Sequence, residues 1–346
     1  MSDRNFSDFT ENSISTVFVT GASGFLGRYV VAEALDSGYN VKAVIRPTSN
    51  EESLPWLNHP ALELVRLDLQ QSEGIREALE GVEAVIHLAA VKSGDYNTQL
   101  AGTVKTTENL LKAMVEARVL RLVAISSFSV FDYLNIPSGT VIDENSPIDS
   151  KPDERDVYAQ MKLFQEQTIH DFAKNDGLQV TTIRPGVIYG RDNLWNAKLG
   201  FELYKNLWIA IGSEAELPLT YVENCADAIV KALGCPEAIG KILNLVDDDL
   251  PTQKTYVNKL IERTGSPPIF SISWTVMNFL IRITWKLNKR LYEKRVKIPG
   301  IMIPAILHAR FKPLTYSNNQ IEKTLNWSPR YSLDVALDRS CHDTSS

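Results

Sequence analysis

Short apolar runs alternate with segments of helical periodicity over the first half of the chain, and this alternation constrains the fold more than any other feature. The runs lie at residues 16–19, 41–45, 62–67, 84–88, 120–126 and 180–183, and helical segments such as 71–79 and 103–117 separate them. Strands that alternate with helices imply parallel pairing through right-handed crossovers. The runs are nearly continuous in Val, Ile and Leu, which indicates strands covered on both faces. The pattern therefore predicts an α/β fold with a doubly wound parallel sheet.

A glycine-rich turn joins the first predicted strand to the first predicted helix. It reads TGASGFLG at residues 20–27, with its three glycines spaced three positions apart. In the first unit of a parallel sheet, such a turn lets a cofactor pyrophosphate approach the backbone and the N-terminus of the helix. The alternative is a tight turn that binds nothing. Because the turn lies between a strand and a helix, we expect it to bind a dinucleotide.

The regular alternation ends near Arg184. Segments rich in Pro, Gly and aromatic residues follow, then a helical pattern at 224–233 and a short strand at 241–245. A chain of 346 residues also exceeds the size at which one hydrophobic core usually stops growing. We therefore expect a disordered lead-in over residues 1–15, a dinucleotide-binding domain over 16–185, and a smaller C-terminal substrate-binding lobe over 186–346 that is interleaved with late elements of the sheet.

Composition excludes several classes of protein. The net charge of -6 argues against a nucleic-acid partner, because phosphate binding needs a concentrated positive field. Three scattered cysteines without a CxxC pair argue against a disulfide framework and against a metal site. The N-terminal residues lack the layout of a signal peptide, and no run of about 18 apolar residues occurs. We expect a cytoplasmic protein that holds no metal.

The glycine-rich turn resembles the TGxxGxxG fingerprint of the extended short-chain dehydrogenase/reductase family, which includes epimerases, dehydratases and 3β-hydroxysteroid dehydrogenase-like enzymes. Later segments are also similar to family landmarks: RPGVIYG at 184–190, YVENCADA at 221–228 and LNWSP at 325–329. The resemblance runs from residue 16 to about residue 337. It implies a Rossmann sheet and a bound nicotinamide dinucleotide.

The resemblance also assigns cofactor contacts along the chain. They fall on the turn, on the ends of the third and fourth strands, on a later helical segment that contains Tyr158 and Lys162, and on the segment after Arg184. The residues are Gly21, Ser23, Gly24, Phe25, Leu26, Gly27, Asp68, Leu69, Leu88, Ala89, Ala90, Tyr158, Lys162, Pro185, Gly186 and Val187. We place His87, at the end of the fourth strand, in the lining of the cofactor pocket.

The end of the second strand indicates which dinucleotide is preferred. NAD-binding members carry an acidic residue there, whose carboxylate accepts hydrogen bonds from the adenosine ribose. This chain has Arg46 instead, and no Asp or Glu lies between Gly38 and Asn50. A guanidinium binds a 2′-phosphate through charge-assisted hydrogen bonds. We expect Arg46 to bind that phosphate, with Arg28 able to assist. NADP(H) is therefore preferred, and NAD(H) stays allowed.

The pentapeptide YAQMK at 158–162 is the YxxxK motif, placed at the start of a helix predicted over 157–172. Residues four apart share a helix face, so the Tyr158 phenol and the Lys162 ammonium are predicted to face one cleft. An adjacent ammonium favours the phenolate of a group whose reference pKa is about 10. The resemblance makes Tyr158 the proton-transfer residue and lets Lys162 contact the nicotinamide ribose.

A serine at the end of the preceding strand is expected to complete the catalytic group. The stretch at 126–131 reads SSFSVF and resembles the SSxxVY of the family, which aligns Ser127 with the catalytic serine. Ser127 would orient the substrate oxygen. Ser126 and Ser129 are alternatives, because clustered serines often bond only their own backbone in turns.

One departure from the family pattern concerns proton relay. The helix that commonly reads NVxGTxNLLEA is here TVKTTENLLKA at 103–113, so Thr103 replaces the first Asn. In related enzymes that Asn belongs to a water-mediated proton path. The resemblance therefore leaves the relay open, although the hydride chemistry is unaffected.

The C-terminal part of the chain contains two features that the family motifs do not explain. Aromatic and apolar residues cluster at 195–209, where they could form either a substrate wall or the core of the small lobe. An apolar stretch at 270–280 precedes a segment at 282–297 with seven Lys or Arg and one Glu. That composition suits peripheral membrane contact through residues 270–297. A solvated basic helix or a lid is the alternative.

Together these patterns predict an NADP(H)-dependent oxidoreductase that interconverts a carbonyl and a secondary alcohol on a hydrophobic small molecule. The alternative is a nucleotide-sugar epimerase or dehydratase with a tightly bound NAD(P), which would take a hydride and return it. A third reading is a regulator that senses the dinucleotide. The intact Ser127, Tyr158 and Lys162 argue against this reading. We also expect a homodimer.

Overall fold

The computed structural model describes residues 14–52, 54–195, 199–204, 207–265, 269–291 and 302–341. Of the lead-in expected over residues 1–15, all but the last two residues lie outside this described part. Within it, no helix combines the length and the apolar character that crossing a membrane requires.

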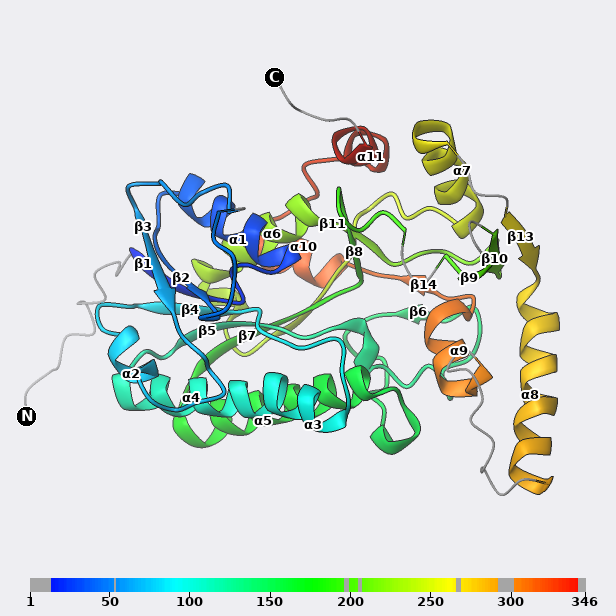
Figure 1. Ribbon diagram of the computed structural model, residues 1–346, viewed down its shortest axis with the longest axis horizontal. Helices are drawn as coiled ribbons and strands as arrows, with labels where there is room; N and C mark the ends of the chain where they lie inside the picture. Colours follow the sequence, from blue (N-terminus) through cyan, green and yellow to red (C-terminus); the bar gives the residue numbers. More distant parts are fainter. Residues whose placement is uncertain are drawn as a thin grey trace, which may run out of the picture.

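A seven-stranded sheet forms the centre of the molecule (Figure 1). All of its neighbouring strands pair in parallel. In spatial order the strands are β12 (Ile242–Leu245), β7 (Gln179–Pro185), β5 (Arg121–Ile125), β4 (Ala84–His87), β1 (Thr16–Thr20), β2 (Asn40–Ile45) and β3 (Leu62–Arg66). The predicted doubly wound parallel sheet is therefore confirmed.

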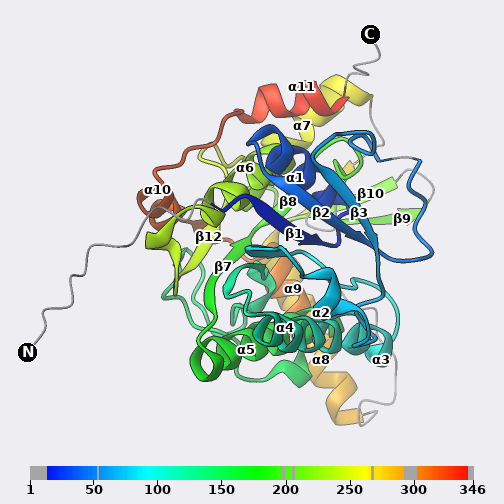
Figure 2. The same cartoon turned by 90° about the vertical axis from the view of Figure 1, so that its left-hand side faces the viewer.

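Helices cover both faces of this sheet (Figure 2). One face packs against α1 (Phe25–Asp36), α6 (Val222–Leu233) and α10 (Asn319–Leu325). The other packs against α2 (Ile75–Ala78), α4 (Thr106–Ala117) and α5 (Val157–Asp176). Each face has its own apolar core, which explains why the strands lack alternating polar residues.

The strand order reverses between β1 and β4. From β1 the chain builds β2 and β3 on one side, and it then returns to build β4, β5 and β7 on the other. At such a switch point the connecting segments diverge and leave a crevice at the carboxyl ends of the strands. The glycine-rich turn follows β1 directly at this crevice.

Two elements differ from the predicted ones. The helix expected over 71–79 is only the short α2, because the N-cap residue Gly74 adopts a left-handed conformation with φ 81° and the helix begins only after it. The helix expected over 103–117 is preceded by α3 (Tyr96–Gln99) and by a π-helical turn at Leu100–Lys105. Single π turns often occur beside functional sites, and this one borders the cleft described below.

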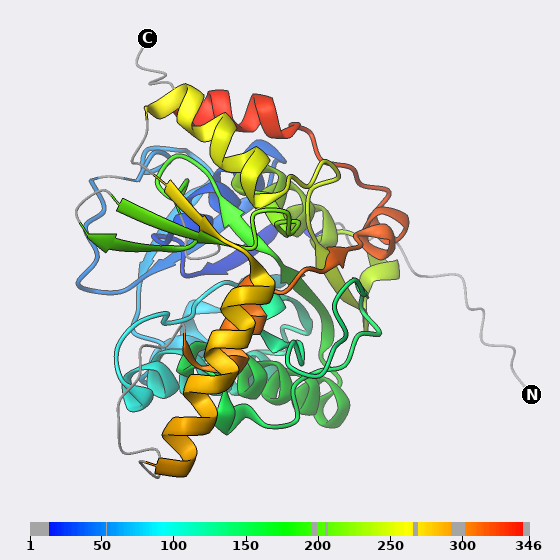
Figure 3. The same ribbon diagram turned by 90° about the vertical axis from the view of Figure 1, so that its right-hand side faces the viewer.

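The C-terminal part of the chain contributes to the sheet and also builds a peripheral layer (Figure 3). The helix α6 and the strand β12 complete the sheet domain. The peripheral elements are the strands β8 (Val187–Tyr189), β9 (Phe201–Tyr204), β10 (Leu207–Ile211), β11 (Leu219–Tyr221), β13 (Ile269–Ile272) and β14 (Thr315–Tyr316), with the helices α7 (Gln253–Thr264), α8 (Trp274–Leu291), α9 (Pro304–Phe311) and α11 (Leu333–Cys341). The strand β6 (Val141–Ile142), from the first half of the chain, pairs with β14. The domain boundary near residue 185 stays a prediction.

Candidate active site

A cleft of about 320 Å³ opens at the carboxyl ends of β1, β2, β4 and β5. It brings together most of the residues that the sequence assigned to cofactor and catalysis. Those that line it are Gly21, Ser23, Gly24, Phe25, Leu26, Gly27, Arg46, Asp68, Leu69, Leu88, Ala89, Ala90, Ser127, Tyr158, Lys162 and Pro185.

Two of the assigned cofactor residues, Gly186 and Val187, are not among those that line the cleft. The Gly186 amide donates to Leu245 O at the end of β12, at 3.0 Å, and the Val187 amide donates to Pro218 O, just before β11, at 2.6 Å. The next residue, Ile188, lines the cleft instead. The assignment of Gly186 and Val187 as contacts is not supported by this geometry.

The glycine-rich turn is shaped by close backbone approach. Gly21 has φ 69°, which disfavours any residue with a side chain. A Cβ on Gly27 would lie 2.1 Å from Gly21 O, so α1 can meet β1 this closely only with glycine there. Gly24 caps α1 without a side-chain hydrogen bond, and no acidic residue occupies the first turn of the helix. The first amides of α1 are thus available to an anion, which fits a dinucleotide pyrophosphate.

At the end of the cleft near β2, the described part of the chain places one cation in the lining. Arg46 is exposed and lines the cleft, and its guanidinium has no hydrogen-bond or ion-pair partner among the described residues. Arg28 differs, because its Nε donates to Ser23 O at 3.3 Å. On the opposite side, Asn109 Nδ2 donates to Leu69 O and Gln70 O, each at 3.0 Å, and so anchors the segment after β3.

The three serines after β5 have different partners. Ser127 interacts with Tyr158 and lowers the pKa of its phenol, and the Ser127 Oγ accepts from Ser129 N at 3.1 Å. Ser126 lines the cleft too, but its hydroxyl donates to Glu166 Oε2 at 2.5 Å. Ser129 is absent from the cleft lining. The geometry therefore favours Ser127 as the serine that meets a substrate oxygen.

Tyr158 and Lys162 face the cleft together, as their spacing on α5 predicts. Burial raises the pKa of Tyr158 to about 12, and the hydrogen bond with Ser127 only partly opposes this. The expected drop in the pKa of the phenol is therefore absent, because burial dominates and the carboxylate of Asp156 raises the pKa further. At neutral pH the resting phenol is protonated and can donate. Burial, reinforced by Lys92, lowers the pKa of Lys162 to about 7.

Lys92 is a cleft residue that sequence reasoning missed. It lies on the segment after β4 and lines the cleft, and burial lowers the pKa of its ammonium. The sequence feature that could have indicated Lys92 is its position, five residues after His87 and just beyond a strand end that was already assigned to cofactor binding. It places a second positive group close to Lys162.

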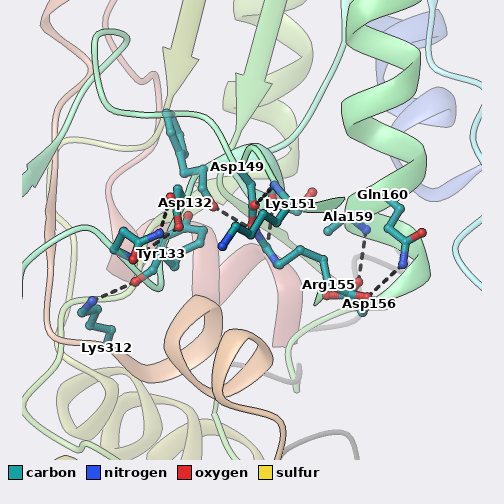
Figure 4. Close-up of polar contacts among 12 residues, drawn as sticks. Asp132, Tyr133, Asp149, Lys151, Arg155, Asp156, Ala159, Gln160 and Lys312 are labelled. Atoms are coloured by element: carbon teal, nitrogen blue, oxygen red, sulfur yellow. Dashed lines mark hydrogen bonds and ion pairs between the residues drawn. The ribbon is translucent and has the colours of Figure 1, made fainter. Parts of the chain in front are cut away.

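A buried ion pair sets the start of α5, as Figure 4 shows. The guanidinium of Arg155 meets Asp149 at 2.8 Å, and it also donates to Ser129 O and Phe131 O, each at 2.9 Å. The next residue, Asp156, caps α5 by accepting from Ala159 N at 3.1 Å. Arg155 therefore ties the segment that carries Ser127 to the helix end that carries Tyr158. No motif pointed to it.

His87 is fully buried and does not line the cleft, so its assignment to the pocket lining is wrong. Its ring nitrogens hydrogen-bond the hydroxyls of Thr20 and Thr107, which lie behind the floor of the cleft. Burial lowers the pKa of His87 to about 3, which keeps the ring neutral.

Thr103, which replaces the family's Asn, is also buried. Its hydroxyl accepts from Val91 N at 3.0 Å, and its carbonyl accepts from Thr107 at 2.7 Å. Thr103 is not among the residues that line the cleft. It fixes the segment after β4 to the π-helical turn.

Two aromatic residues of the 195–209 segment pack against the core of the peripheral layer. The rings of Trp195 and Trp208 lie 5.4 Å apart and pack against the core around β8 and β11, which favours core packing over a substrate wall. Over the residues that the structure describes, no group of three or more His, Cys, Asp or Glu could hold a metal ion.

Comparison with known proteins places the chain in a recognised group. A model of the NAD dependent epimerase/dehydratase family matches residues 17–245. Sterol-4-alpha-carboxylate 3-dehydrogenase, decarboxylating, from Homo sapiens is 27% identical in an alignment of 365 positions, gaps included, that covers 95% of this chain and 88% of that protein. Cinnamoyl-CoA reductase 1 from Arabidopsis thaliana is 28% identical over 239 residues, which cover 66% of this chain and 69% of that protein.

The fold is also similar to solved structures. A dTDP-glucose 4,6-dehydratase from Streptomyces venezuelae, with NAD bound, matches with a TM-score of 0.71 at 20% identity, over 94% of this chain and 95% of that one. A UDP-glucuronic acid 4-epimerase from Bacillus cereus, in complex with NAD, matches with a TM-score of 0.70 at 20% identity, over 94% and 97% of the two chains. Identity this low shows a common fold alone.

Proposed function

The chain belongs to the NAD dependent epimerase/dehydratase family, and on that premise we propose that it is an NADP(H)-dependent oxidoreductase. It would interconvert a carbonyl and a secondary alcohol on a hydrophobic small molecule. An NAD(P)-dependent oxidoreductase of the extended short-chain class is what its reductase and dehydrogenase relatives have in common. One observation carries the proposal: Ser127, Tyr158 and Lys162 line the same cleft as the glycine-rich turn.

Three side chains of the cleft have separate roles in the reduction of a carbonyl group. A bound nicotinamide supplies the hydride. The Tyr158 hydroxyl donates its proton to the substrate oxygen, and the Ser127 hydroxyl holds that oxygen by a hydrogen bond. Lys162, in its ammonium form, stabilises the phenolate that remains on Tyr158. In the oxidative direction the same groups act in reverse.

Substrate class is tested most directly with purified protein, NADPH and a panel of aldehydes, ketones and acyl thioesters. We expect loss of absorbance at the reduced nicotinamide band with apolar members of the panel, since two relatives are named for a cinnamoyl thioester and a sterol. Tightly bound cofactor without net turnover would instead favour the epimerase or dehydratase alternative, which the same three side chains could serve.

The NADP(H) preference rests on the unpartnered guanidinium of Arg46. Arg46→Asp should lower NADPH affinity by about 10- to 100-fold, because it replaces a charge-assisted hydrogen bond with repulsion. NADH affinity should change little. The measurement is titration of both cofactors by nicotinamide fluorescence. Arg76→Asp makes the same charge change on an exposed residue of α2, outside the cleft lining, and serves as the control.

The helix α8 supports the expected membrane contact through residues 270–297, of which 292–297 lie outside the described part. Its inner side, through Ile281, packs with α9. Its outer side has large apolar residues: Val276 is 51% exposed, Phe279 63%, Leu280 49%, Ile283 42% and Leu287 49%. At about 100° per residue these five fall within an arc of roughly 100°. Figure 3 shows α8 at the outside of the molecule.

The charge of α8 indicates what covers this apolar stripe. The helix sequence contains Arg282, Lys286, Lys289 and Arg290 and no Asp or Glu. Two copies of such a helix would repel each other, whereas an anionic lipid surface would attract it. We propose that the outer face of α8 lies on an anionic membrane surface.

Sedimentation with lipid vesicles tests this contact. The double variant Arg282→Glu/Lys286→Glu should bind vesicles containing phosphatidylserine at least about 100-fold more weakly than the wild type, since each cation near such a surface contributes about 1 kcal/mol. Vesicles of phosphatidylcholine alone should bind the wild type weakly. Lys151→Glu/Lys174→Glu carries the same charge change on other exposed residues. Equal binding by both double variants would refute the contact.

The homodimer and the cytoplasmic location stay proposals as well. Light scattering on the purified full chain would decide the first. Fractionation of cells, followed by a salt wash of the membrane fraction, would show whether the protein is cytoplasmic, bound peripherally to membranes, or both.

A further inference from the structure

We propose that Gln165 is the positioning residue for the Lys162 ammonium, held in one orientation by a directional chain of buried hydrogen bonds that begins beneath the glycine-rich turn. The inference deepens the proposed oxidoreductase function and rests on it for its consequence in catalysis. It concerns the side of Lys162 that faces away from the cleft, where Gln165 and its partners lie behind the residues that line the cleft.

Lys162 has two fixed acceptors. Its Nζ donates to Ile125 O and to Gln165 Oε1, each at 2.8 Å. Both side chains are almost completely buried, with Lys162 3% exposed and Gln165 2% exposed. An ammonium has three donors, so one remains for the cleft that Lys162 lines. The two fixed bonds therefore decide where the third donor points.

The amide of Gln165 cannot turn around. Its Nε2 donates to Thr107 Oγ1 at 2.8 Å, and Thr107 gives its only hydroxyl proton to Thr103 O at 2.7 Å. The Thr107 oxygen can therefore only accept from Gln165. A flipped amide would place an oxygen against Thr107, which has no proton left to donate, and an NH₂ group against Lys162.

His87 completes the chain and anchors it to the cofactor turn. Because Thr107 has no proton to spare, His87 Nε2 is the donor in their 2.8 Å contact. Gln165 Nε2 lies 3.3 Å from the same ring nitrogen and is not bonded to it, since both atoms are donors. His87 Nδ1 then accepts from Thr20 Oγ1 at 2.8 Å. The Thr20 oxygen in turn accepts from Leu88 N at 3.2 Å and Ala89 N at 3.3 Å. Since the imidazole is neutral, every donor in the chain has one direction.

Because of the charges around Lys162, its hydrogen bond to Gln165 matters for the pKa of the amine. Lys92, from the segment after β4, disfavours the ammonium, as burial does. Glu166 on α5 favours it, but this carboxylate is engaged by Ser126 and by Arg184. Tyr158 on α5 and His87 on β4 are uncharged at neutral pH. The Gln165 oxygen is thus a neutral acceptor that helps to keep the amine charged at neutral pH.

Two substitutions at this position should move the pKa of Lys162 in opposite directions. Gln165→Met keeps the size of the side chain but removes the acceptor, so the pKa of Lys162 should fall by about one unit or more. Gln165→Glu places a carboxylate against the amine, so the pKa should rise by a similar amount. A residue that only filled space would not produce shifts of opposite sign.

The first measurement needs no turnover. The ε-carbon chemical shift of Lys162, in protein labelled with ¹³C-lysine and assigned with Lys162→Arg, is titrated against pH in protein without cofactor. Gln167→Met and Gln167→Glu, on the exposed side of the same helix, should leave the titration unchanged. Thermal melts identify any variant that fails to fold. If one Gln165 variant fails, the direction of the Lys162 pKa shift in the other variant decides whether Gln165 positions the amine.

The second measurement connects the contact to catalysis. Because the ammonium is the active form, turnover should be lost as pH rises through the pKa of Lys162. The basic limb of kcat should therefore move to lower pH in Gln165→Met and to higher pH in Gln165→Glu, with KM for the substrate little changed. The proposal would be overturned if the Lys162 pKa and the basic limb of kcat did not shift in either variant, or if they shifted in the same direction in both variants. If the protein lacked oxidoreductase activity, the titration of Lys162 would still decide the role of Gln165.

Discussion

Tyr158→Phe should reduce turnover of carbonyl substrate by about 100- to 10,000-fold, the range that a positioned proton donor usually contributes. The phenol is protonated at neutral pH because burial raises its pKa more than Ser127 lowers it. Removing one oxygen therefore deletes the proton donor and leaves the aromatic ring in place. The turn that would bind the pyrophosphate lies elsewhere in the cleft, so NADPH affinity should stay within a few fold of the wild type.

Two measurements separate loss of chemistry from loss of binding. Steady-state rates at saturating NADPH give the first, and nicotinamide fluorescence titration gives the second. Tyr96→Phe removes a phenol hydroxyl from an exposed residue of α3 and should behave like the wild type. Turnover retained in Tyr158→Phe would exclude the proposed mechanism, and equal loss of binding and turnover would mean that Tyr158 serves mainly to hold the cofactor.

Gly27→Ala should weaken cofactor binding by about 100-fold, because displacement of the turn by about 1 Å is enough for an effect of this size. The added methyl group would lie 2.1 Å from Gly21 O and 2.9 Å from the backbone of Ala22. Both neighbours are backbone, so the turn or the start of α1 has to move. The first amides of α1 would then no longer converge on one anion. Overpacking should also lower the free energy of unfolding by about 1–3 kcal/mol.

Calorimetry with NADPH measures the affinity, and urea unfolding measures the stability. Gly234→Ala is the matched control, because a methyl group there meets only the Tyr39 hydroxyl, at 3.4 Å. If Gly27→Ala bound NADPH as tightly as the control does, the turn would not be the pyrophosphate site.

Much of this cleft was predictable from the chain alone. The turn at 20–27 and the pair Tyr158 and Lys162 line one cleft, as expected, although more than 130 residues separate them. The reason is that carboxyl ends of neighbouring parallel strands meet at the same edge of the sheet. Ser127 was preferred over Ser126 and Ser129 by alignment, and the hydrogen bonds of the three serines favour the same choice.

The predictions that did not hold depended on local conformation or on packing. The helix expected at 71–79 is interrupted by the left-handed Gly74. His87 was expected to line the pocket, but it is buried behind the cleft floor. A strand end indicates that a residue lies near the crevice. It does not indicate on which side of the sheet the side chain points.

The sequence by itself determined the doubly wound sheet, the place of the turn and the identity of the groups that could transfer a proton. Hydrophobic periodicity, glycine conformation and helical spacing are local properties, so short segments specify them. Only the tertiary structure decided that Arg155 ties the Ser127 segment to α5, that Lys92 lies near Lys162, and that Gln165 orients the amine. The bond from Gln165 to Thr107 joins residues 58 positions apart. Such contacts depend on how helices pack across the sheet, which no single segment specifies.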